Sequence, residues 1–320
     1  MGSLHARVYA QLRKKEGVEL AGVYSRRATR AKELGKIVGA PACTDAGEIL
    51  DDDSIDAVDV CVPSQHHRRH VVAALERGKH VFCETPMALT LEDADAMLGA
   101  ARKNRRFLIV AQVMRFVAPY MRAHDEVIAG KLGRPRLIVA RRLSRPYWSR
   151  KRPRPFRAYG EPLIELSIHD FDVVNWFLGR PVSCLAAGVE GPSGRTEHAF
   201  ATIAYRNAAA LVEGSAMMPR GFPFTTALRV QCEEGVLDMT AQFTAGPIPE
   251  ERFVRYRVGR RPEAVRVRGH DPYEEECRHF VRCVQGKADA GLLRAESERD
   301  ALWIALAARE SMRTRGSVRL

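Results

Sequence analysis

Short apolar runs alternate with amphipathic stretches over the first third of the chain. The apolar runs have the length of buried strands and lie at 18–24, 57–62, 80–83 and 107–113. The stretches between them repeat apolar residues at helical spacing and lie at 29–38, 66–77 and 90–103. Thr90, three residues before Asp93, is a typical helix N-cap. Strands that alternate with helices in this way predict a parallel, doubly wound sheet.

After residue 120 the pattern changes to strands in succession. These predicted strands lie at 135–143, 183–189, 199–205, 208–216, 226–232, 236–240, 253–258 and 264–268. Helices are predicted at 120–129, 163–178, 273–285 and 295–313. Strands that follow one another favour antiparallel pairing. The pattern therefore predicts a nucleotide-type α/β domain, followed by an α+β domain with a large open sheet rich in antiparallel pairs.

The composition is that of a folded globular protein with an excess of basic residues. The 320 residues include 51 Lys and Arg against 39 Asp and Glu, a formal net charge of +12. No apolar run approaches the roughly 20 residues that span a bilayer, and residues 1–15 lack the apolar block of a secretory signal. We therefore expect no membrane association and a cytoplasmic location. Seven scattered cysteines without a C-x-x-C pair predict buried, reduced thiols.

Several short motifs occur along the chain in a definite order. They are 61–64 (CVPS) with His67, 78–86 (GKHVFCETP), 115–119 (RFVAP), 130–133 (GKLG) and 165–172 (ELSIHDFD). Together they resemble the Gfo/Idh/MocA family of glucose-fructose oxidoreductases and inositol dehydrogenases, and residues 1–5 resemble the end of that family's glycine-rich turn. The resemblance implies a dinucleotide-binding Rossmann-like domain over 1–115 and a domain for substrate binding and oligomerisation over 116–320.

Members of this family bind NAD or NADP on the first domain and oxidise or reduce a hydroxyl of a sugar or cyclitol. The resemblance therefore implies a small-molecule substrate and a homo-oligomer, either a dimer or a tetramer. It places cofactor contacts at Met1, Gly2, Pro63, Ser64, His67 and Glu84. It places proton handling at Thr85, Glu165 and His169, and substrate contacts at Arg115 and Asp170.

The chain departs from the family pattern at its start. A dinucleotide fold begins with a central strand that leads into G-x-G-x-x-G, and only the last glycine, Gly2, is present here. We expect the strand and the first two glycines to lie upstream of Met1. The alternative is a degenerate chain that has lost the cofactor site.

Two further departures concern the residues that handle protons. Thr85 stands where the family has Lys, and its hydroxyl can orient a group but cannot titrate near neutral pH. Glu165 stands in the position of the family's Asp, four residues before His169 on a predicted helix, so that both share one face. His169 is therefore the leading proton acceptor, with Glu165 as its partner. A surface Glu/His pair without chemistry is the alternative.

The residues after the predicted strand at 18–24 bear on the choice of cofactor, because this strand is the second of the dinucleotide fold once the expected upstream strand is counted. NAD sites usually place an acidic residue there, whereas a 2'-phosphate requires cations. Ser25, Arg26 and Arg27 occupy this position, so we expect NADP(H) rather than NAD(H). A solvated arginine pair at a strand end is the alternative.

A basic segment at 141–157 holds eight basic residues and no acidic one. We expect Tyr147, Trp148, Arg152 and Arg154 to bind a phosphate-bearing substrate such as a nucleotide-sugar, and a solvated loop is the alternative. The chain carries no motif that reads nucleic acid, so a nucleic-acid partner is not expected. Three histidines at 66, 67 and 70 lack a completing carboxylate or cysteine nearby, so we expect no metal site.

The sequence thus predicts an NADP(H)-dependent oxidoreductase. It would act on a hydroxyl or keto group of a sugar, cyclitol or nucleotide-sugar by hydride transfer. A non-catalytic sensor of sugar or cofactor with the same fold is the alternative, favoured by Thr85 and the missing glycines.

Overall fold

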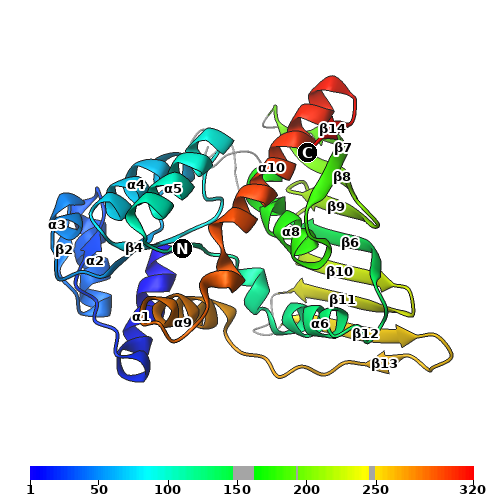
Figure 1. The fold of residues 1–320 in the computed structure, drawn as a ribbon, viewed down its shortest axis with the longest axis horizontal. Coiled ribbons are helices and arrows are strands. Elements are labelled where there is room, and N and C mark those ends of the chain that lie inside the picture. The colour runs from blue at the N-terminus through cyan, green and yellow to red at the C-terminus, as the bar shows by residue number, and fades with distance from the viewer. Residues whose placement is uncertain (147–161, 192–193, 245–248) are drawn as a thin grey trace. The chain divides into compact units, whose positions relative to one another are not determined.

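The computed structural model describes residues 1–146, 162–191, 194–244 and 249–320. The chain forms two compact units, each made from two segments (Figure 1). The first unit comprises Met1–Phe116 and His270–Glu296, and the second comprises Val117–Gly269 and Ser297–Leu320. The sequence analysis placed 270–296 in the second domain, whereas in the structure this segment packs with the first. Among the described residues, no helix combines the length and the apolarity that crossing a membrane requires.

The first unit alternates strands with helices, as predicted. Its elements are α1 (Gly2–Glu16), β1 (Val23–Tyr24), α2 (Ala28–Val38), β2 (Ala42–Cys43), α3 (Gly47–Leu50), β3 (Ala57–Val60), η1 (Ser64–His66), α4 (His67–Glu76), β4 (His80–Cys83), α5 (Leu91–Asn104), β5 (Leu108–Val110), η2 (Val113–Phe116), α9 (Pro272–Val284) and η3 (Ala290–Leu293). All neighbouring strands pair in parallel. The Thr90 side chain caps α5 by accepting a hydrogen bond from the Asp93 amide, as predicted.

The parallel strands form two separate sheets, β1–β2 and β3–β4–β5. The predicted strand at 18–24 is reduced to the two residues of β1. Among the described residues, β1 pairs with β2 alone and β3 with β4 alone. A strand is defined by backbone hydrogen bonds to a neighbouring strand. Residues 18–22 are paired with no strand among the described residues, so they are not classed as strand.

The helices α1 and α9 lie together beside the three-stranded sheet (Figure 1). The core between them includes Leu12 from α1, Phe82 and Ile109 from the sheet, and Phe280 from α9. The Phe82 and Phe280 rings stack with their centroids 5.1 Å apart. Residues 270–296 therefore join the first unit because the apolar face of α9 completes this core.

The second unit is built on one nine-stranded sheet. Its elements are α6 (Ala118–Ile128), β6 (Pro135–Leu143), α8 (Pro162–Leu178), β7 (Pro181–Glu190), β8 (Thr196–Tyr205), β9 (Ala209–Ser215), β10 (Phe224–Cys232), β11 (Gly235–Phe243), β12 (Glu250–Arg257), β13 (Glu263–Ala264), α10 (Ala295–Thr314) and β14 (Val318–Arg319). The strand order is β13-β12-β11-β10-β6-β9-β8-β7-β14. Helix α8 packs on β6, β8 and β9.

The pairing in this sheet is antiparallel, as predicted, with one exception. Strands β6 and β9 run parallel in the middle of the sheet. A parallel pair needs a long crossover connection, and here α8, β7 and β8 lie between the two strands in the sequence. The sheet is therefore mixed, with its parallel pair next to α8.

Candidate cofactor-binding and proton-transfer residues

The N-terminus of α1 lies close to the residue that follows β3. Gly2 is the first residue of the helix, and a Cβ atom added to it would lie 3.2 Å from the Cβ of Cys61. The first turn of α1 holds no acidic residue. A helix N-terminus with open amide groups attracts anions such as a pyrophosphate. Met1 and Gly2, for which a cofactor contact is predicted from the sequence, thus lie at the carboxyl end of a parallel strand.

His67 connects two loops of the first unit. It is buried, with its Nε2 atom 2.7 Å from the Val62 carbonyl oxygen and its Nδ1 atom 3.1 Å from the Pro86 carbonyl oxygen. These oxygens belong to the loops after β3 and β4. The imidazole therefore orients the loop that carries Pro63 and Ser64, both expected to contact the cofactor.

Glu84 and Thr85 follow β4 directly. The Oε2 atom of Glu84 accepts a hydrogen bond of 2.9 Å from the Thr85 amide, and its Oε1 atom lies 3.2 Å from the Nε2 atom of His5. Glu84 is thereby fixed on both sides. Thr85 is half-buried, and its side chain offers a hydroxyl at this position and no titrating group.

His5 lies at the centre of a buried group of ionisable side chains. Its Nδ1 atom is 2.8 Å from Asp59 Oδ2, and its Nε2 atom is 4.0 Å from Glu276 Oε1. Burial alone would lower the pKa of His5, but Asp59 and Glu84 together raise it to about 11. Burial also raises the pKa of Glu276 well above its usual range.

No pattern in the sequence indicates His5, Asp59 or Glu276 as site residues. The one available sign was Glu276, which lies four residues before Phe280 on the apolar face of a helix. The other two residues come from a helix and a strand that are distant in the sequence, and no local pattern connects them.

Ser25, Arg26 and Arg27 follow β1, where the cofactor specificity was expected to be set. The Ser25 hydroxyl accepts a hydrogen bond of 3.3 Å from the Arg27 amide. Both arginines are exposed, and within the described part of the chain neither forms an ion pair. Two cations are thus available to a ligand at this strand end.

In the second unit, α8 carries Glu165 and His169 on one face, both half-buried. The Nδ1 atom of His169 has no hydrogen-bond partner among the residues that the structure describes. Burial and the neighbouring Arg142 cation lower the pKa of His169 to about 3. The imidazole is therefore neutral at physiological pH, with a ring nitrogen available to a ligand.

Asp170, the next residue, is engaged by Arg142. The guanidinium donates two hydrogen bonds to the carboxylate, of 2.8 and 3.1 Å, and both side chains are buried. A bidentate pair of this kind fixes both partners. Asp170 was expected to contact substrate, and in the structure its two oxygens face Arg142, which joins β6 to α8.

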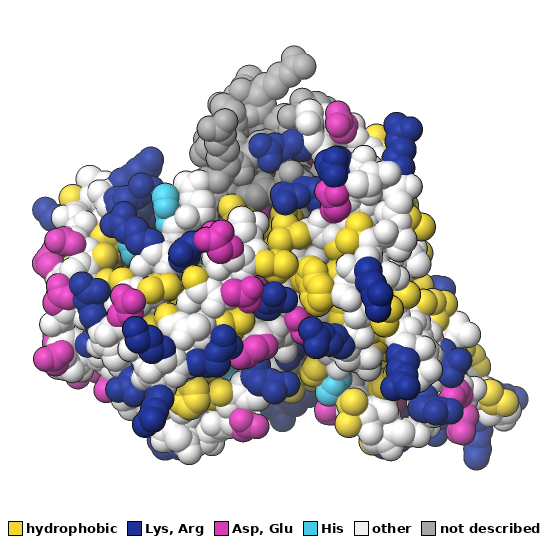
Figure 2. Space-filling view, turned by 45° about the horizontal axis from the view of Figure 1, so that its top comes forward, with side chains coloured by type: hydrophobic (Ala, Val, Ile, Leu, Met, Phe, Trp, Pro, Cys, Tyr) yellow, Lys and Arg dark blue, Asp and Glu magenta, His cyan; other side chains and the backbone are white. Residues whose placement is uncertain are grey.

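The remaining expected substrate residues divide into two groups. Arg115 is buried and donates a hydrogen bond of 2.5 Å to the Leu292 carbonyl oxygen. Tyr147, Trp148, Arg152 and Arg154 lie outside the described residues. On the face shown in Figure 2, Lys and Arg side chains are interspersed with Asp and Glu.

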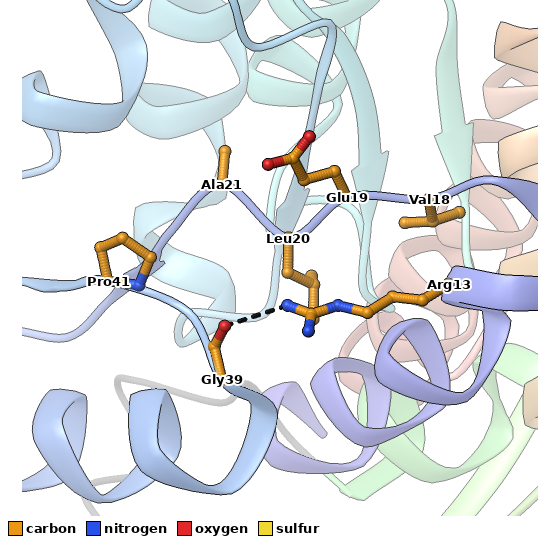
Figure 3. A pocket seen from close by; sticks show the side chains of 7 residues that line it. All are labelled: Arg13, Val18, Glu19, Leu20, Ala21, Gly39 and Pro41. Atoms are coloured by element: carbon orange, nitrogen blue, oxygen red, sulfur yellow. Dashed lines mark hydrogen bonds between the residues drawn. The ribbon is translucent and has the colours of Figure 1, made fainter.

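A surface hollow of the first unit lies away from these residues. It is lined by Arg13, Val18, Glu19, Leu20, Ala21, Gly39 and Pro41 (Figure 3). Arg13 crosses it and donates a hydrogen bond of 3.1 Å to the Gly39 carbonyl oxygen. This hollow lies at the C-terminal part of α1, whereas Met1 and Gly2 are at the opposite end of that helix.

Comparisons with known proteins identify two family domains along the chain. Residues 1–112 match the profile of an oxidoreductase family with an NAD-binding Rossmann fold. Residues 120–238 match the GFO/IDH/MocA C-terminal domain.

Several characterised proteins are similar in sequence. The 4-carboxy-2-hydroxymuconate-6-semialdehyde dehydrogenase of Sphingobium sp. is 30% identical over 185 residues, which cover 55% of this chain and 56% of that protein. The myo-inositol 2-dehydrogenase of Thermotoga maritima is 26% identical over 336 residues, covering 100% of this chain and 96% of that protein. The chain spans about half the length of the curated relatives that it matches first.

Solved structures share the fold. The UDP-N-acetylglucosamine 3-dehydrogenase of Acidithiobacillus ferrooxidans superposes with a TM-score of 0.82, covering 98% of this chain and 95% of that chain, at 23% identity. At this identity the likeness concerns the fold alone. It confirms the predicted order, a Rossmann-like domain followed by a domain with a large, mostly antiparallel sheet.

Proposed function

The chain belongs to the Gfo/Idh/MocA family of oxidoreductases, and from that premise we propose that it transfers hydride between NADP(H) and a carbon of a sugar, cyclitol or nucleotide-sugar. Relatives named as dehydrogenases of myo-inositol and of UDP-N-acetylglucosamine support this substrate class. The bound nicotinamide supplies the hydride chemistry, and the protein supplies orientation and proton transfer.

The cofactor would be held by residues at the carboxyl ends of the parallel strands. The N-terminus of α1 fits a pyrophosphate, because Gly2 leaves room beside Cys61 and no acid occupies the first turn. Pro63, Ser64 and Glu84 belong to the loops at the same strand ends. In this proposal His67 packs between those two loops, and burial, which lowers its pKa, leaves it one N–H to donate to a carbonyl oxygen of one of them.

The observation that carries the proposed activity is the neutral His169. Removing hydride from a hydroxyl-bearing carbon requires a group that accepts the hydroxyl proton. The Nδ1 atom of the neutral His169 has no partner among the described residues, so it can accept a hydrogen bond from that hydroxyl. A pKa near 3 makes the imidazole a weak base, so proton transfer in this proposal requires Glu165 and the bound substrate to raise that pKa toward the working pH. Glu165, on the same face of α8, would orient or polarise the imidazole, and Thr85 would orient the hydroxyl.

The activity is tested by NADPH absorbance with a panel of keto-sugars, keto-cyclitols and their nucleotide derivatives. Consumption of NADPH that is lost in His169→Ala supports the proposal. NADPH or sugar binding without turnover of any substrate would support the second candidate, a sensor of the same fold, which is favoured by the non-titrating Thr85.

The preference for NADP(H) is supported by the exposed cations of Arg26 and Arg27. Titration of NADPH and NADH compares the two cofactors directly. We expect Arg26→Gln with Arg27→Gln to weaken NADPH binding about tenfold or more and to leave NADH binding nearly unchanged. Tighter binding of NADH by the parent protein would refute the preference.

A phosphate-bearing substrate is the narrower form of the proposal. It is supported by the basic segment at 141–157, which includes Tyr147 and Trp148 as stacking groups. Arg152→Ala with Arg154→Ala should lower turnover of a nucleotide-sugar more than turnover of the free sugar. An equal effect on both substrates would leave no role for phosphate.

The proposed location and assembly follow from two further observations. The seven cysteines are all free thiols, which supports a cytoplasmic location.

Leu185 and Phe200, on neighbouring strands of the nine-stranded sheet, are exposed, which supports a homodimer or homotetramer through that sheet face. Leu185→Glu with Phe200→Glu should yield a monomer in light-scattering measurements.

A further inference from the structure

The His5 group contains a ring nitrogen aimed at two carboxylates. His5 Nδ1 lies 2.8 Å from Asp59 Oδ2, which leaves Nε2 facing the other way. Nε2 is 3.2 Å from Glu84 Oε1 and 4.0 Å from Glu276 Oε1. The side chains of His5 and Glu276 are each 1% exposed and that of Glu84 is 12% exposed. His5 Nε2 therefore has one carboxylate oxygen of each glutamate within 4.0 Å.

Glu276 has no other evident partner. Neither of its carboxylate oxygens forms a hydrogen bond with any residue that the structure describes, and neither does His5 Nε2. A buried polar group without a partner is costly and calls for an explanation. A proton shared between His5 and Asp59 accounts for those two residues, but it leaves both oxygens of Glu276 without a partner.

A sulfur atom completes the group. Donor atoms of His5, Cys61 and Glu84 all lie within 4.8 Å of one another. The Cys61 sulfur lies 3.4 Å from His5 Nδ1, and the thiol donates a hydrogen bond of 2.9 Å to Asp59 Oδ1. Ligation by Cys61 would therefore require its sulfur to leave Asp59 and turn toward Glu84. The donor set is thus one imidazole nitrogen, one thiol sulfur and carboxylate oxygens.

We propose that His5, Cys61, Glu84 and Glu276 form a binding site for a divalent transition metal of the zinc class. Zinc is bound by imidazole, thiolate and carboxylate at about 2.0–2.3 Å, so its ligand atoms lie some 3–4 Å apart. The separations of 3.2 and 4.0 Å from His5 Nε2 are of this size. Hard cations such as magnesium prefer oxygen donors alone and do not suit the group.

Asp59 would hydrogen-bond to the ligand His5 and would not bind the metal itself. A ligating histidine usually donates its other ring N–H to a carboxylate, which fixes the ring and its tautomer. The contact between His5 Nδ1 and Asp59 has this geometry. The four ligands come from α1, from the ends of β3 and β4, and from α9, so the metal would join these elements of the first unit. The inference does not depend on the proposed redox function.

Cobalt binding to the full chain tests the site, because Co²⁺ bound to thiolate gives a charge-transfer absorption band in the near ultraviolet. We expect one equivalent of Co²⁺ to produce this band, Zn²⁺ to abolish it by displacement, and Mg²⁺ to leave it unchanged. Cys61→Ser should remove the band. Glu276→Gln, which keeps the side-chain volume, should weaken Co²⁺ binding about tenfold or more.

Cys43→Ser is the matched control, since Cys43 is also a half-buried free thiol close to Glu48 and Asp45. It should retain the band. Thermal unfolding provides a second measurement, because a ligand of the folded state raises the melting temperature. Absence of the band in the parent protein, or a band that remains in Cys61→Ser, would overturn the site. A melting temperature that Zn²⁺ does not change would also overturn it.

Discussion

Two histidines of this protein, the buried His5 and the half-buried His169, have opposite charge states, and their neighbours explain the difference. His5 in the first unit lies between Asp59 and Glu84, which raise its pKa to about 11 despite its burial. His169 in the second unit is near Arg142, and burial together with that cation lowers its pKa to about 3. Burial alone lowers the pKa of any histidine. The sign of the adjacent charge therefore decides whether the imidazole is a cation in the metal-free protein or a neutral acceptor.

The largest effect is expected for His169→Ala. Loss of the proton acceptor should lower kcat/KM by about 100-fold to 10,000-fold, the usual contribution of a general acid or base. Steady-state kinetics with NADPH and the best substrate of the panel measures it. His198→Asn is the control, because His198 is a partly exposed histidine of β8 that contacts Glu213 of β9 and has no proposed role in proton transfer. Equal losses in both variants would show that His169 has no specific chemical role.

Asp59→Asn should have the next largest effect, on stability. It removes the carboxylate that pairs with the His5 cation. Breaking a buried ion pair costs about 3 kcal/mol or more, and we expect the lower value because the Asp59 side chain is 17% exposed. Urea unfolding of the metal-free protein measures the change. A cost below about 1 kcal/mol, the value of a surface pair, would mean that His5 is not a buried cation.

The charge state of His169 predicts a pH dependence. Its pKa is about 3 when folded and about 6.5 when unfolded. The unfolded chain therefore binds a proton first as the pH falls. The stability contributed by neutral His169 is complete above pH 6.5 and is lost progressively between pH 6.5 and 3. NMR of the ¹⁵N-labelled imidazole should show no titration of His169 between pH 5 and 8.

The double variant Arg142→Gln with Asp170→Asn tests the cause of that low pKa. It replaces the buried ion pair with neutral groups of similar size that can still hydrogen-bond. Loss of the cation should move the titration of His169 upward, toward the ordinary value. An unchanged titration would assign the low pKa to burial alone.

The smallest effect is expected for His198→Asn. The contact of His198 Nε2 with Glu213 Oε1 spans 3.3 Å between partly exposed side chains, and we expect its loss to cost at most about 1 kcal/mol, the upper value for a surface pair. Urea unfolding should therefore barely distinguish this variant from the parent. A loss of several kcal/mol in the free energy of unfolding would contradict this prediction, because it would show that a partly exposed histidine pair stabilises the fold strongly.

Much of the fold could be predicted from local patterns. The bounds of β4 and β6 agree with the predicted strands, and α5 begins after its predicted cap. These elements depend on short-range periodicity and capping, which a single sequence contains. The parallel pairing of β6 with β9, and the packing of α9 in the first unit, depend on contacts between distant segments.

The candidate site was predicted in part, for the same physical reason. His169 and Glu165 lie on one helix four residues apart, so helical geometry alone places them on a common face. His5, Asp59 and Glu276 come from two helices and a strand. They lie close together because of tertiary packing, so their spacing along the chain does not predict their proximity. The roles of all these residues in catalysis or binding stay predictions.

The interleaving of the two units has a consequence for synthesis of the chain. Because α9 completes the core around Phe82 and Ile109, the first unit cannot finish folding when the ribosome has made only residues 1–116. The core around those side chains is completed only by residues 270–296, which are translated after every strand of the nine-stranded sheet except β14. Vectorial folding of the first unit is therefore postponed, and we expect residues 1–116 expressed alone to be far more sensitive to protease than the same residues in the full chain.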